Sequence, residues 1–405
     1  MVGVRVVRGE GKSCQRKDIY LLILYHVFLN LQSFFAKKLD ADEISPYNIG
    51  NENNSCLRGE TNMNFHNKDG MTAYLQSLVD EELTPCISVA ASYKGETVYA
   101  GTAARKNDPL YEGYNAQIRH NIGSVSKIIT GALFAKALET GKLTVWDRVK
   151  KFLPEYPYED NDIMQLLCHS TGYSSFIENI PRPHFELTTD EYVALICKNA
   201  VREYAPGTES RYFSLGYTLV MAIIERVTGM DYESFARKVL FDPIGMNDST
   251  FDMHKVSPAN TILPYNRDTD TYETDWCRRP TGDSGLYTTA ADLLKFGNLL
   301  NDAYHGRENP VFTQWQAHYL FGECTEGKFI RTPAMWMKGN HDRYGFFGDF
   351  CSPEACGHTG YSGCMLMVDP TYEISIAILT NSCHLHMNWN NYRIISNRIM
   401  GEIRN

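Results

Sequence analysis

The stretch Gly123-Ser124-Val125-Ser126-Lys127 opens an apolar run that ends before Gly141. The run predicts a helix over 124–140 that is apolar on nearly all its faces, as is typical of a helix buried between other layers. Residues three apart on a helix share a face, so Ser124 and Lys127 are expected to lie together. A serine needs a neighbouring base to act as a nucleophile, and a lysine on an apolar helix is costly unless it faces a polar site. Because Ser124 can also serve as a simple helix N-cap, the pair alone is a weak signal.

Two later segments carry polar groups suited to the same chemistry. Tyr212 follows a loop with Pro206 and Gly207 and precedes a helical pattern, so we expect it at a loop–helix junction, where a phenol can exchange a proton with a serine and a lysine. Gly357-His358-Thr359-Gly360 directly precedes an expected strand, where small residues let a substrate approach and supply an N–H donor. Taken separately, Tyr212 is more simply explained as a packed ring and His358 as a structural residue.

The order of secondary-structure patterns predicts the architecture. Besides 124–140, helices are expected at 71–79, 190–200, 215–228 and 388–403, and strands at 86–93, 96–100, 361–368 and 372–380. Strands at both ends of the chain around a helical middle predict an α/β fold of the α+β type, in which helices flank an antiparallel sheet and an all-helical lobe is inserted.

In this order and with this spacing, the three motifs resemble those of the serine β-lactamase and penicillin-binding-protein superfamily, in particular its class C-like, β-lactamase-related serine hydrolases. Five further landmarks of that family recur in order, at 143–147, 166–173, 206–208, 243–246 and 285–292. The resemblance implies one catalytic domain over 70–405, with an α/β lobe at about 70–130 and 275–405 and a helical lobe at about 131–274. Residues 1–69 are left as an N-terminal extension and linker.

The resemblance implies a catalytic role for each of several residues. Ser124 would be the acylated nucleophile, Lys127 its proton acceptor, and Tyr212 the proton shuttle that activates Ser124 and later the hydrolytic water. The oxyanion hole would use the backbone N–H groups of Ser124 and Tyr361. These roles imply a serine hydrolase that works through an acyl-enzyme, with no cofactor and no metal ion.

The segments that would bind substrate depart from the family in two places. The family's Tyr-x-Asn is Tyr212-Phe213-Ser214 here, so an amide is replaced by the single hydroxyl of Ser214. His358, which the resemblance places in the substrate site with Thr359 and Gly360, stands where β-lactamases have lysine. A neutral imidazole lacks the fixed charge that holds a substrate carboxylate. Both changes favour a peptidase, amidase or esterase over an efficient β-lactamase.

Other functions stay open. Within the family, the alternatives are a β-lactamase and a D-Ala-D-Ala carboxypeptidase. From another class, the lost asparagine and the N-terminal segment allow a catalytically weak, penicillin-binding-like sensor or binding protein, although the complete set of Ser124, Lys127 and Tyr212 argues against it. A zinc hydrolase has only His384 and His386 in its favour, without an H-E-x-x-H motif or an acidic ligand set.

The composition of the 405 residues is that of an ordinary soluble protein, with 43% hydrophobic residues and a net charge of −9 from 39 basic and 48 acidic side chains. It excludes collagen-like, disordered and coiled-coil chains. Since no long Lys/Arg run is present, there is no electrostatic footprint for nucleic acid or for an anionic membrane. A small-molecule or peptide substrate is therefore expected.

The chain has eleven scattered cysteines, an odd number without metal-site spacing. Such a set suits reduced thiols and favours a cytoplasmic compartment. Cys351, Cys356 and Cys364 are close enough in sequence for two of them to pair, but buried free thiols explain them more simply.

The N-terminal segment leaves the compartment open. Basic residues precede an apolar run at 19–31, an order that resembles a signal peptide, but no small-residue cleavage site follows and the run is too short to span a bilayer. An uncleaved export or anchor segment and an incidental amphipathic extension are both compatible with this pattern. Any membrane association is expected only through this segment, and the sequence does not predict an oligomeric state.

Overall fold

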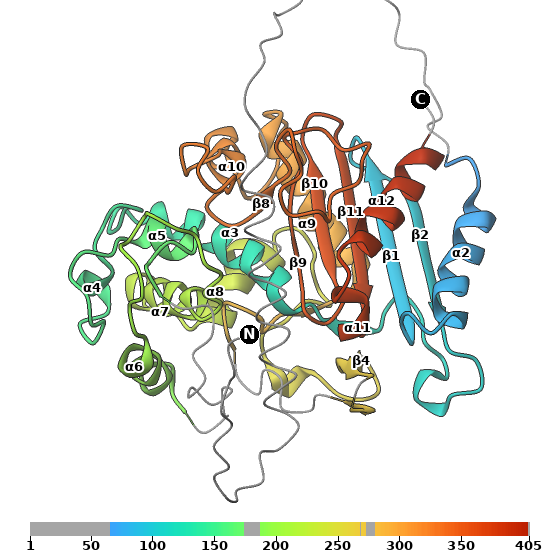
Figure 1. Cartoon of the computed structure of the whole chain (residues 1–405), viewed down its shortest axis with the longest axis horizontal. Helices are drawn as coiled ribbons and strands as arrows, with labels where there is room; N and C mark the ends of the chain where they lie inside the picture. Colours follow the sequence, from blue (N-terminus) through green and yellow to red (C-terminus); the bar gives the residue numbers. More distant parts are fainter. Residues whose placement is uncertain (1–64, 174–186, 268, 273–279, 404–405) are drawn as a thin grey trace, which may run out of the picture. The chain divides into compact units, whose positions relative to one another are not determined.

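The computed structural model describes residues 65–173, 187–267, 269–272 and 280–403, all within one compact unit, Thr61–Asn405 (Figure 1). The apolar run at 19–31 and nearly all of the expected N-terminal extension lie outside the described residues. Among the helices of the described part, none is long and apolar enough to cross a bilayer.

A six-stranded antiparallel sheet organises this unit (Figure 1). Its strands lie in the order β2-β1-β11-β10-β9-β8, so two early strands pair with four late ones. The strands are β1 (Cys86–Tyr93), β2 (Glu96–Ala104), β8 (Trp336–Met337), β9 (Cys356–Thr359), β10 (Met365–Asp369) and β11 (Ile374–Thr380). β1 joins the two groups, because it pairs with β2 on one side and with β11 on the other. The predicted sheet built from both ends of the chain is confirmed.

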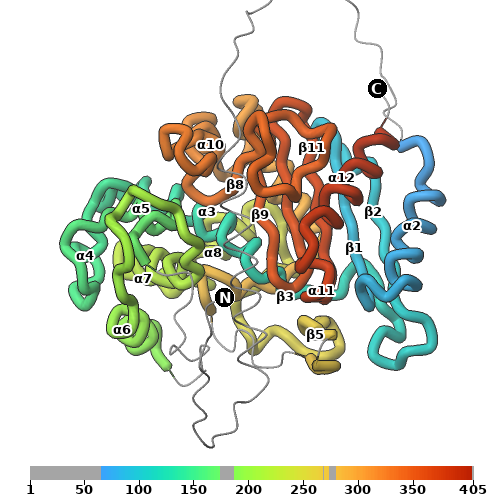
Figure 2. The backbone as a smooth tube through the Cα atoms, viewed as in Figure 1, coloured from blue at the N-terminus to red at the C-terminus, as the bar shows by residue number. Residues whose placement is uncertain are grey.

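Helices cover both faces of the sheet, which explains why β11 is buried along its whole length. Alternate residues of β11, such as Ile376, pack with α2 (Lys68–Asp80) and α12 (Asn390–Glu402). The residues between them, such as Ala377, face the core that contains α9 (Ala290–Tyr304). Figure 2 shows α2 and α12 beside β1 and β2.

A helical layer packs beside the sheet around α3 (Ser126–Leu138), in which nearly every residue is buried. α3 contacts α7, α10 and β9. The other helices are α4 (Val149–Phe152), α5 (Ile163–Leu167), α6 (Thr189–Asn199), α7 (Gly216–Thr228), α8 (Tyr232–Ala236), α10 (Gln314–Phe321) and α11 (Cys383–His386). Short strands form two small sheets, one from β3 (Arg119–Asn121), β4 (Thr261–Ile262) and β7 (Tyr287–Thr288), the other from β5 (Tyr265–Asn266) and β6 (Thr271–Tyr272).

Local signals explain where several helices begin and end. Asp162 and Thr188 form capping boxes at the starts of α5 and α6, where their side chains accept hydrogen bonds from backbone N–H groups of the first turn. Gly229 ends α7 in the left-handed conformation, with φ +70°. The helices expected at 71–79, 190–200, 215–228 and 388–403 are all present, with ends that differ by a few residues.

Two expected elements differ from the structure. The helix expected over 124–140 begins as a 3₁₀ turn, η2 (Gly123–Val125), before α3. The strand expected at 361–368 is wrong in its first half, because the Gly360 N–H donates to Cys364 O at 2.7 Å and the Gly363 N–H donates to Gly360 O at 2.9 Å. These bonds form a tight turn, which Gly363 permits by adopting φ +86°. His358 consequently lies inside β9 rather than before a strand.

Candidate active site

Ser124 and Lys127 lie together at the start of α3. Ser124 is in the turn η2 and Lys127 is in the first turn of α3, and Lys127 Nζ lies 3.0 Å from Ser124 Oγ. Gly123 makes the turn possible by adopting φ +52°, and its N–H donates to the side-chain oxygen of Asn121. Lys127 is 0% exposed, whereas Ser124 is half-buried. The hydroxyl of Ser124 is therefore the accessible member of the pair.

Lys127 Nζ contacts three oxygen atoms: Ser124 Oγ at 3.0 Å, Ser214 Oγ at 2.9 Å and the main-chain oxygen of Asp283 at 2.8 Å. As an ammonium group it donates to all three, which compensates for its burial. As a neutral amine it has two hydrogens, one for Ser214 and one for Asp283, and its lone pair then faces Ser124 Oγ. This arrangement lets Lys127 accept a proton from Ser124.

Tyr212 contacts the other side of the serine, with its hydroxyl 2.6 Å from Ser124 Oγ. Its ring lies 4.6 Å from the ring of His169, and Lys127 Nζ lies 5.0 Å from its centroid. The buried Phe213 anchors this loop, because its N–H donates to His169 Nδ1 at 3.1 Å. Burial holds the pKa of His169 well below its usual range, so this imidazole is neutral at pH 7. The phenol is thus held where it can exchange a proton with Ser124.

Asp283 is a site residue that the sequence analysis does not single out. It is 7% exposed, and its carboxylate accepts hydrogen bonds from three hydroxyl groups, those of Ser214 at 2.9 Å, Thr218 at 3.0 Å and Ser284 at 3.2 Å. Because Ser214 also accepts from Lys127, its hydroxyl bridges the lysine and the carboxylate. The departure from the family's asparagine therefore brings a buried carboxylate into contact with the site.

The position of Asp283 depends on close packing of its loop. A Cβ on Gly282 would collide with the main-chain oxygen of Tyr217 in α7. The Thr130 hydroxyl in α3 donates to Gly282 O at 2.5 Å. The loop is therefore held between α3 and α7, at the place where its next carbonyl oxygen reaches Lys127.

Two glycines bring the turn after β9 against the start of α3. A Cβ on Gly360 would collide with the carbonyl oxygen of Ile122 and would lie 3.4 Å from Ser124 N. A Cβ on Gly123 would lie 3.2 Å from Tyr361 N. The backbone nitrogens of Ser124 and Tyr361 thus belong to two segments in direct contact, as two N–H groups must if they are to bind one oxyanion.

His358 and Thr359 are buried in β9. His358 Nδ1 lies 2.6 Å from Thr359 O, whereas neither His358 Nε2 nor Thr359 Oγ1 has a hydrogen-bond partner within the described residues. Burial, followed by the positive charge of Lys127, holds the pKa of His358 well below its usual range. This position therefore offers a hydrogen bond without a positive charge at pH 7.

An aromatic cluster that the sequence analysis does not identify lies beside His358. The ring of Trp336 in β8 is 4.6 Å from that of His358 and 6.2 Å from that of Tyr212. Tyr344 and Trp389 lie against Trp336 at 4.7 Å and 5.0 Å. These rings come from separate segments of the chain, so no local sequence pattern predicts that they form a cluster.

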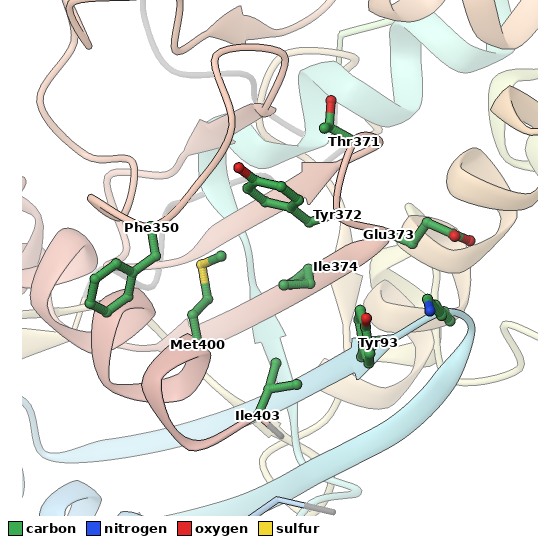
Figure 3. Close-up of a pocket in the computed structure, with 9 residues that line it drawn as sticks. Tyr93, Phe350, Thr371, Tyr372, Glu373, Ile374, Met400 and Ile403 are labelled. Carbon is green, nitrogen blue, oxygen red and sulfur yellow. The ribbon is translucent and has the colours of Figure 1, made fainter. Parts of the chain in front are cut away.

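Other candidate features lie apart from this site. A hollow of about 280 Å³, lined by residues that include Tyr93, Tyr372 and Met400, lies at the turn between β10 and β11 and contains none of the candidate site residues (Figure 3). That turn is at the opposite end of β10 from the residues that pair with His358. The described residues contain no group of three or more His, Cys, Asp or Glu side chains that could hold a metal ion. Cys351, Cys356 and Cys364 are free and buried.

The chain is similar to known proteins. A family model described as Beta-lactamase matches residues 71–393. An N-acetylmuramyl-L-alanine amidase from Bacillus subtilis (strain 168) is 24% identical over 296 residues, which cover 63% of this chain and 66% of the amidase.

Two solved structures share the fold. A class C β-lactamase has a TM-score of 0.66 and 16% identity, covering 84% of this chain and 96% of that one. A D-amino acid amidase from Ochrobactrum anthropi SV3 has a TM-score of 0.63 and 17% identity, covering 82% and 97%. The resemblance and the fold class predicted from the sequence are both confirmed.

Proposed function

The chain belongs to the β-lactamase family, and from this we propose that it is a serine hydrolase that cleaves amide, peptide or ester bonds through an acyl-enzyme on Ser124. One observation carries the proposal. Ser124 Oγ lies 3.0 Å from Lys127 Nζ and 2.6 Å from the Tyr212 hydroxyl. A serine with a proton-transfer group on each side is the arrangement that nucleophilic catalysis requires.

Acylation begins with neutral Lys127, whose two hydrogens lie on Ser214 and Asp283. Lys127 takes the Ser124 proton as Oγ attacks the substrate carbonyl carbon, and the backbone N–H groups of Ser124 and Tyr361 receive the oxyanion. The bond to the leaving group then breaks, and Tyr212 donates its proton to the departing amine or alcohol. The product of this half-reaction is an ester on Ser124, an ammonium on Lys127 and a phenolate on Tyr212.

Deacylation reverses the proton movements. The Tyr212 phenolate, which has the Lys127 ammonium 5.0 Å from its ring centroid, takes a proton from water as the water oxygen attacks the acyl carbon. The ester bond to Ser124 breaks, and Ser124 Oγ recovers its proton from Lys127. All three side chains return to their starting states, and one water molecule is consumed for each substrate molecule cleaved.

The substrate class follows from the charge at His358. A buried neutral imidazole stands where β-lactamases place a lysine, so this position does not supply a cation for a substrate carboxylate. This supports acyl substrates whose leaving group carries no carboxylate, and it ranks amides, peptides and esters above β-lactams and D-Ala-D-Ala peptides. The similarity to an N-acetylmuramyl-L-alanine amidase supports an amide as one bond that the protein cleaves.

Intact-protein and peptide mass spectrometry after treatment with a fluorophosphonate tests the nucleophile. The expected result is one adduct on Ser124 that is absent in Ser124→Ala. A folded protein that acquires no adduct would overturn the proposal and favour a sensor or binding protein. A panel of nitrophenyl esters, D-amino-acid amides and a chromogenic cephalosporin tests the substrate order, which fast cephalosporin turnover would reverse.

A further inference from the structure

Two cysteines far apart in the chain touch beside the active site. Cys168, at the end of α5, and Cys324, shortly after α10, are 156 residues apart, and their Sγ atoms lie 3.1 Å from each other. A disulfide bond has a length of about 2.05 Å, so the two sulfur atoms need to approach by only about 1 Å. Cys168 is buried, whereas Cys324 is half-buried and is the thiol that a small oxidant reaches first.

A buried cation and a carboxylate both lie near the pair. Arg331 is 6% exposed, and within the described residues its Nε has no hydrogen-bond partner. Its main-chain oxygen accepts from Cys324 N at 2.9 Å, so the two residues are directly joined. The contact with Cys324, burial and the charge of Glu323 raise the pKa of Cys168, whereas the charge of Arg331 lowers it. Cys324 is thus the partly exposed thiol of the pair, and access to solvent is one condition for a cysteine to react with an oxidant.

Cys168 is also directly connected to the residues around Tyr212. His169 follows it with φ +54°, a left-handed conformation that is strained for a side chain of this size, and its ring lies 4.6 Å from that of Tyr212. The carbonyl oxygen of Cys168 accepts a hydrogen bond from the Ser210 hydroxyl at 3.0 Å. A displacement of Cys168 would therefore move the His169 ring that contacts Tyr212, and it would also move the loop that carries Tyr212.

We propose that Cys168 and Cys324 are a redox modification site, which forms a reversible disulfide bond, and that this bond slows acylation of Ser124 by displacing His169 and Tyr212. The slowing of acylation rests on the proposed function, whereas the bond itself does not. With hydrogen peroxide as oxidant, the Cys324 thiol loses its proton and the thiolate attacks one peroxide oxygen, so that the O–O bond breaks and a sulfenic acid forms. The hydroxide that leaves takes up the proton lost by Cys324 and becomes water. Cys168 Sγ then attacks the Cys324 sulfur, the S–O bond breaks, and hydroxide leaves with the Cys168 proton as water. Two thiols and one peroxide thus give one disulfide and two water molecules.

The bond is tested on the full-length protein with hydrogen peroxide or glutathione disulfide, followed by peptide mapping without reduction. The expected result is a linked pair of peptides that contain Cys168 and Cys324, lighter by two hydrogen atoms and separated by dithiothreitol. Cys168→Ser and Cys324→Ser should each lack this product, while Cys197→Ser, which removes a buried thiol in α6, should retain it. Failure to form this link in the folded wild-type protein would overturn the proposal.

The effect on the site is measured as the rate at which a fluorophosphonate labels Ser124. Since misplacing a catalytic group by about 1 Å can cost up to 100-fold in rate, we expect oxidation to slow labelling about tenfold or more. Dithiothreitol should restore the rate, and Cys324→Ser should be insensitive to oxidant. A disulfide that leaves the rate unchanged would overturn the coupling. If the reduced protein is never labelled, the proposed function and the coupling are both overturned. The disulfide bond is tested separately by the peptide map.

Discussion

The hydroxyl group of Ser214 donates a hydrogen bond of 2.9 Å to the carboxylate of Asp283. Because this bond uses the only hydrogen of the hydroxyl, Ser214 Oγ is left to accept from Lys127 Nζ, which also lies 2.9 Å away. Asp283 thereby orients the Ser214 hydroxyl so that its oxygen can accept a hydrogen bond from Lys127. Predictions about Ser214 and Asp283 follow from this one geometry.

Two substitutions of Ser214 test whether Lys127 needs a hydrogen-bond acceptor at this position. One removes the acceptor, and the other keeps an acceptor on a different side chain. Ser214→Ala should lower kcat/KM about 10- to 100-fold, which corresponds to about 1.4–2.7 kcal/mol, because Lys127 loses an acceptor and Asp283 loses a donor. Ser214→Asn should retain most of the activity, since an amide can accept from Lys127 and donate to Asp283 at once. Steady-state kinetics on a nitrophenyl ester measure both variants. Native kcat/KM in Ser214→Ala would show that an oriented acceptor is not required.

Asp283→Asn tests whether the carboxylate orients the serine. The variant keeps the side-chain shape but places an NH2 donor against the hydroxyl of either Ser214 or Thr218, both of which donate to the carboxylate in the native protein. We expect kcat/KM to fall about tenfold, with circular dichroism unchanged. Asp302→Asn, which breaks an ion pair with Arg307 outside the site, is the matched control and should leave the kinetics unchanged. Native kinetics in a folded Asp283→Asn protein would contradict the orienting role.

His120 should contribute to a loss of protein stability on mild acidification. This residue is buried in β3, and burial lowers its pKa from 6.5 to about 4. Below pH 6.5 the unfolded chain binds a proton that the folded protein does not take up until about pH 4. The contribution of neutral His120 is therefore complete above pH 6.5 and is lost as the pH falls toward 4, by about 3 kcal/mol in total.

Urea unfolding at a series of pH values between 7 and 4 measures this slope. His120→Gln should make the slope shallower by the contribution of one group, because glutamine does not titrate. His169, His358 and His386 keep their lowered pKa values and still contribute. The exposed His341 provides the control, and His341→Gln should leave the slope as in the native protein. If His120→Gln and the native protein lost stability in parallel, another group would have to account for the acid sensitivity.

The sequence predicts those parts of the molecule that depend on contacts between residues close together in the chain. Ser124 and Lys127 are one helical turn apart, so their contact follows from the helix alone. The β1–β2 hairpin follows from two β-prone runs around Lys94 and Gly95, which take φ +52° and +82°.

The parts that the sequence does not predict depend on contacts between distant segments. Asp283 and Lys127 are 156 residues apart, and nothing in the loop around Asp283 indicates that its carbonyl oxygen meets α3. The placement of Trp336 against His358 likewise requires the pairing of β8 with β9. The strand expected at 361–368 is wrong in its first half because the backbone hydrogen bonds of Gly360 and Gly363 form a turn there.

Gly360→Ala tests the contact that brings the two candidate oxyanion donors together. A Cβ at this position would collide with the Ile122 carbonyl oxygen, so the turn after β9 must move away from η2, and Tyr361 N must move away from Ser124 N. Loss of one oxyanion donor costs about 100- to 1,000-fold in kcat, so we expect kcat to fall about 100-fold, with a smaller change in KM. Gly401→Ala, near the end of α12, would place its added Cβ 3.9 Å from Phe350, an ordinary contact distance, and is the matched control that should behave as the native protein. Thermal unfolding verifies that Gly360→Ala is folded; a folded variant with native kcat would show that these two N–H groups do not bind the oxyanion.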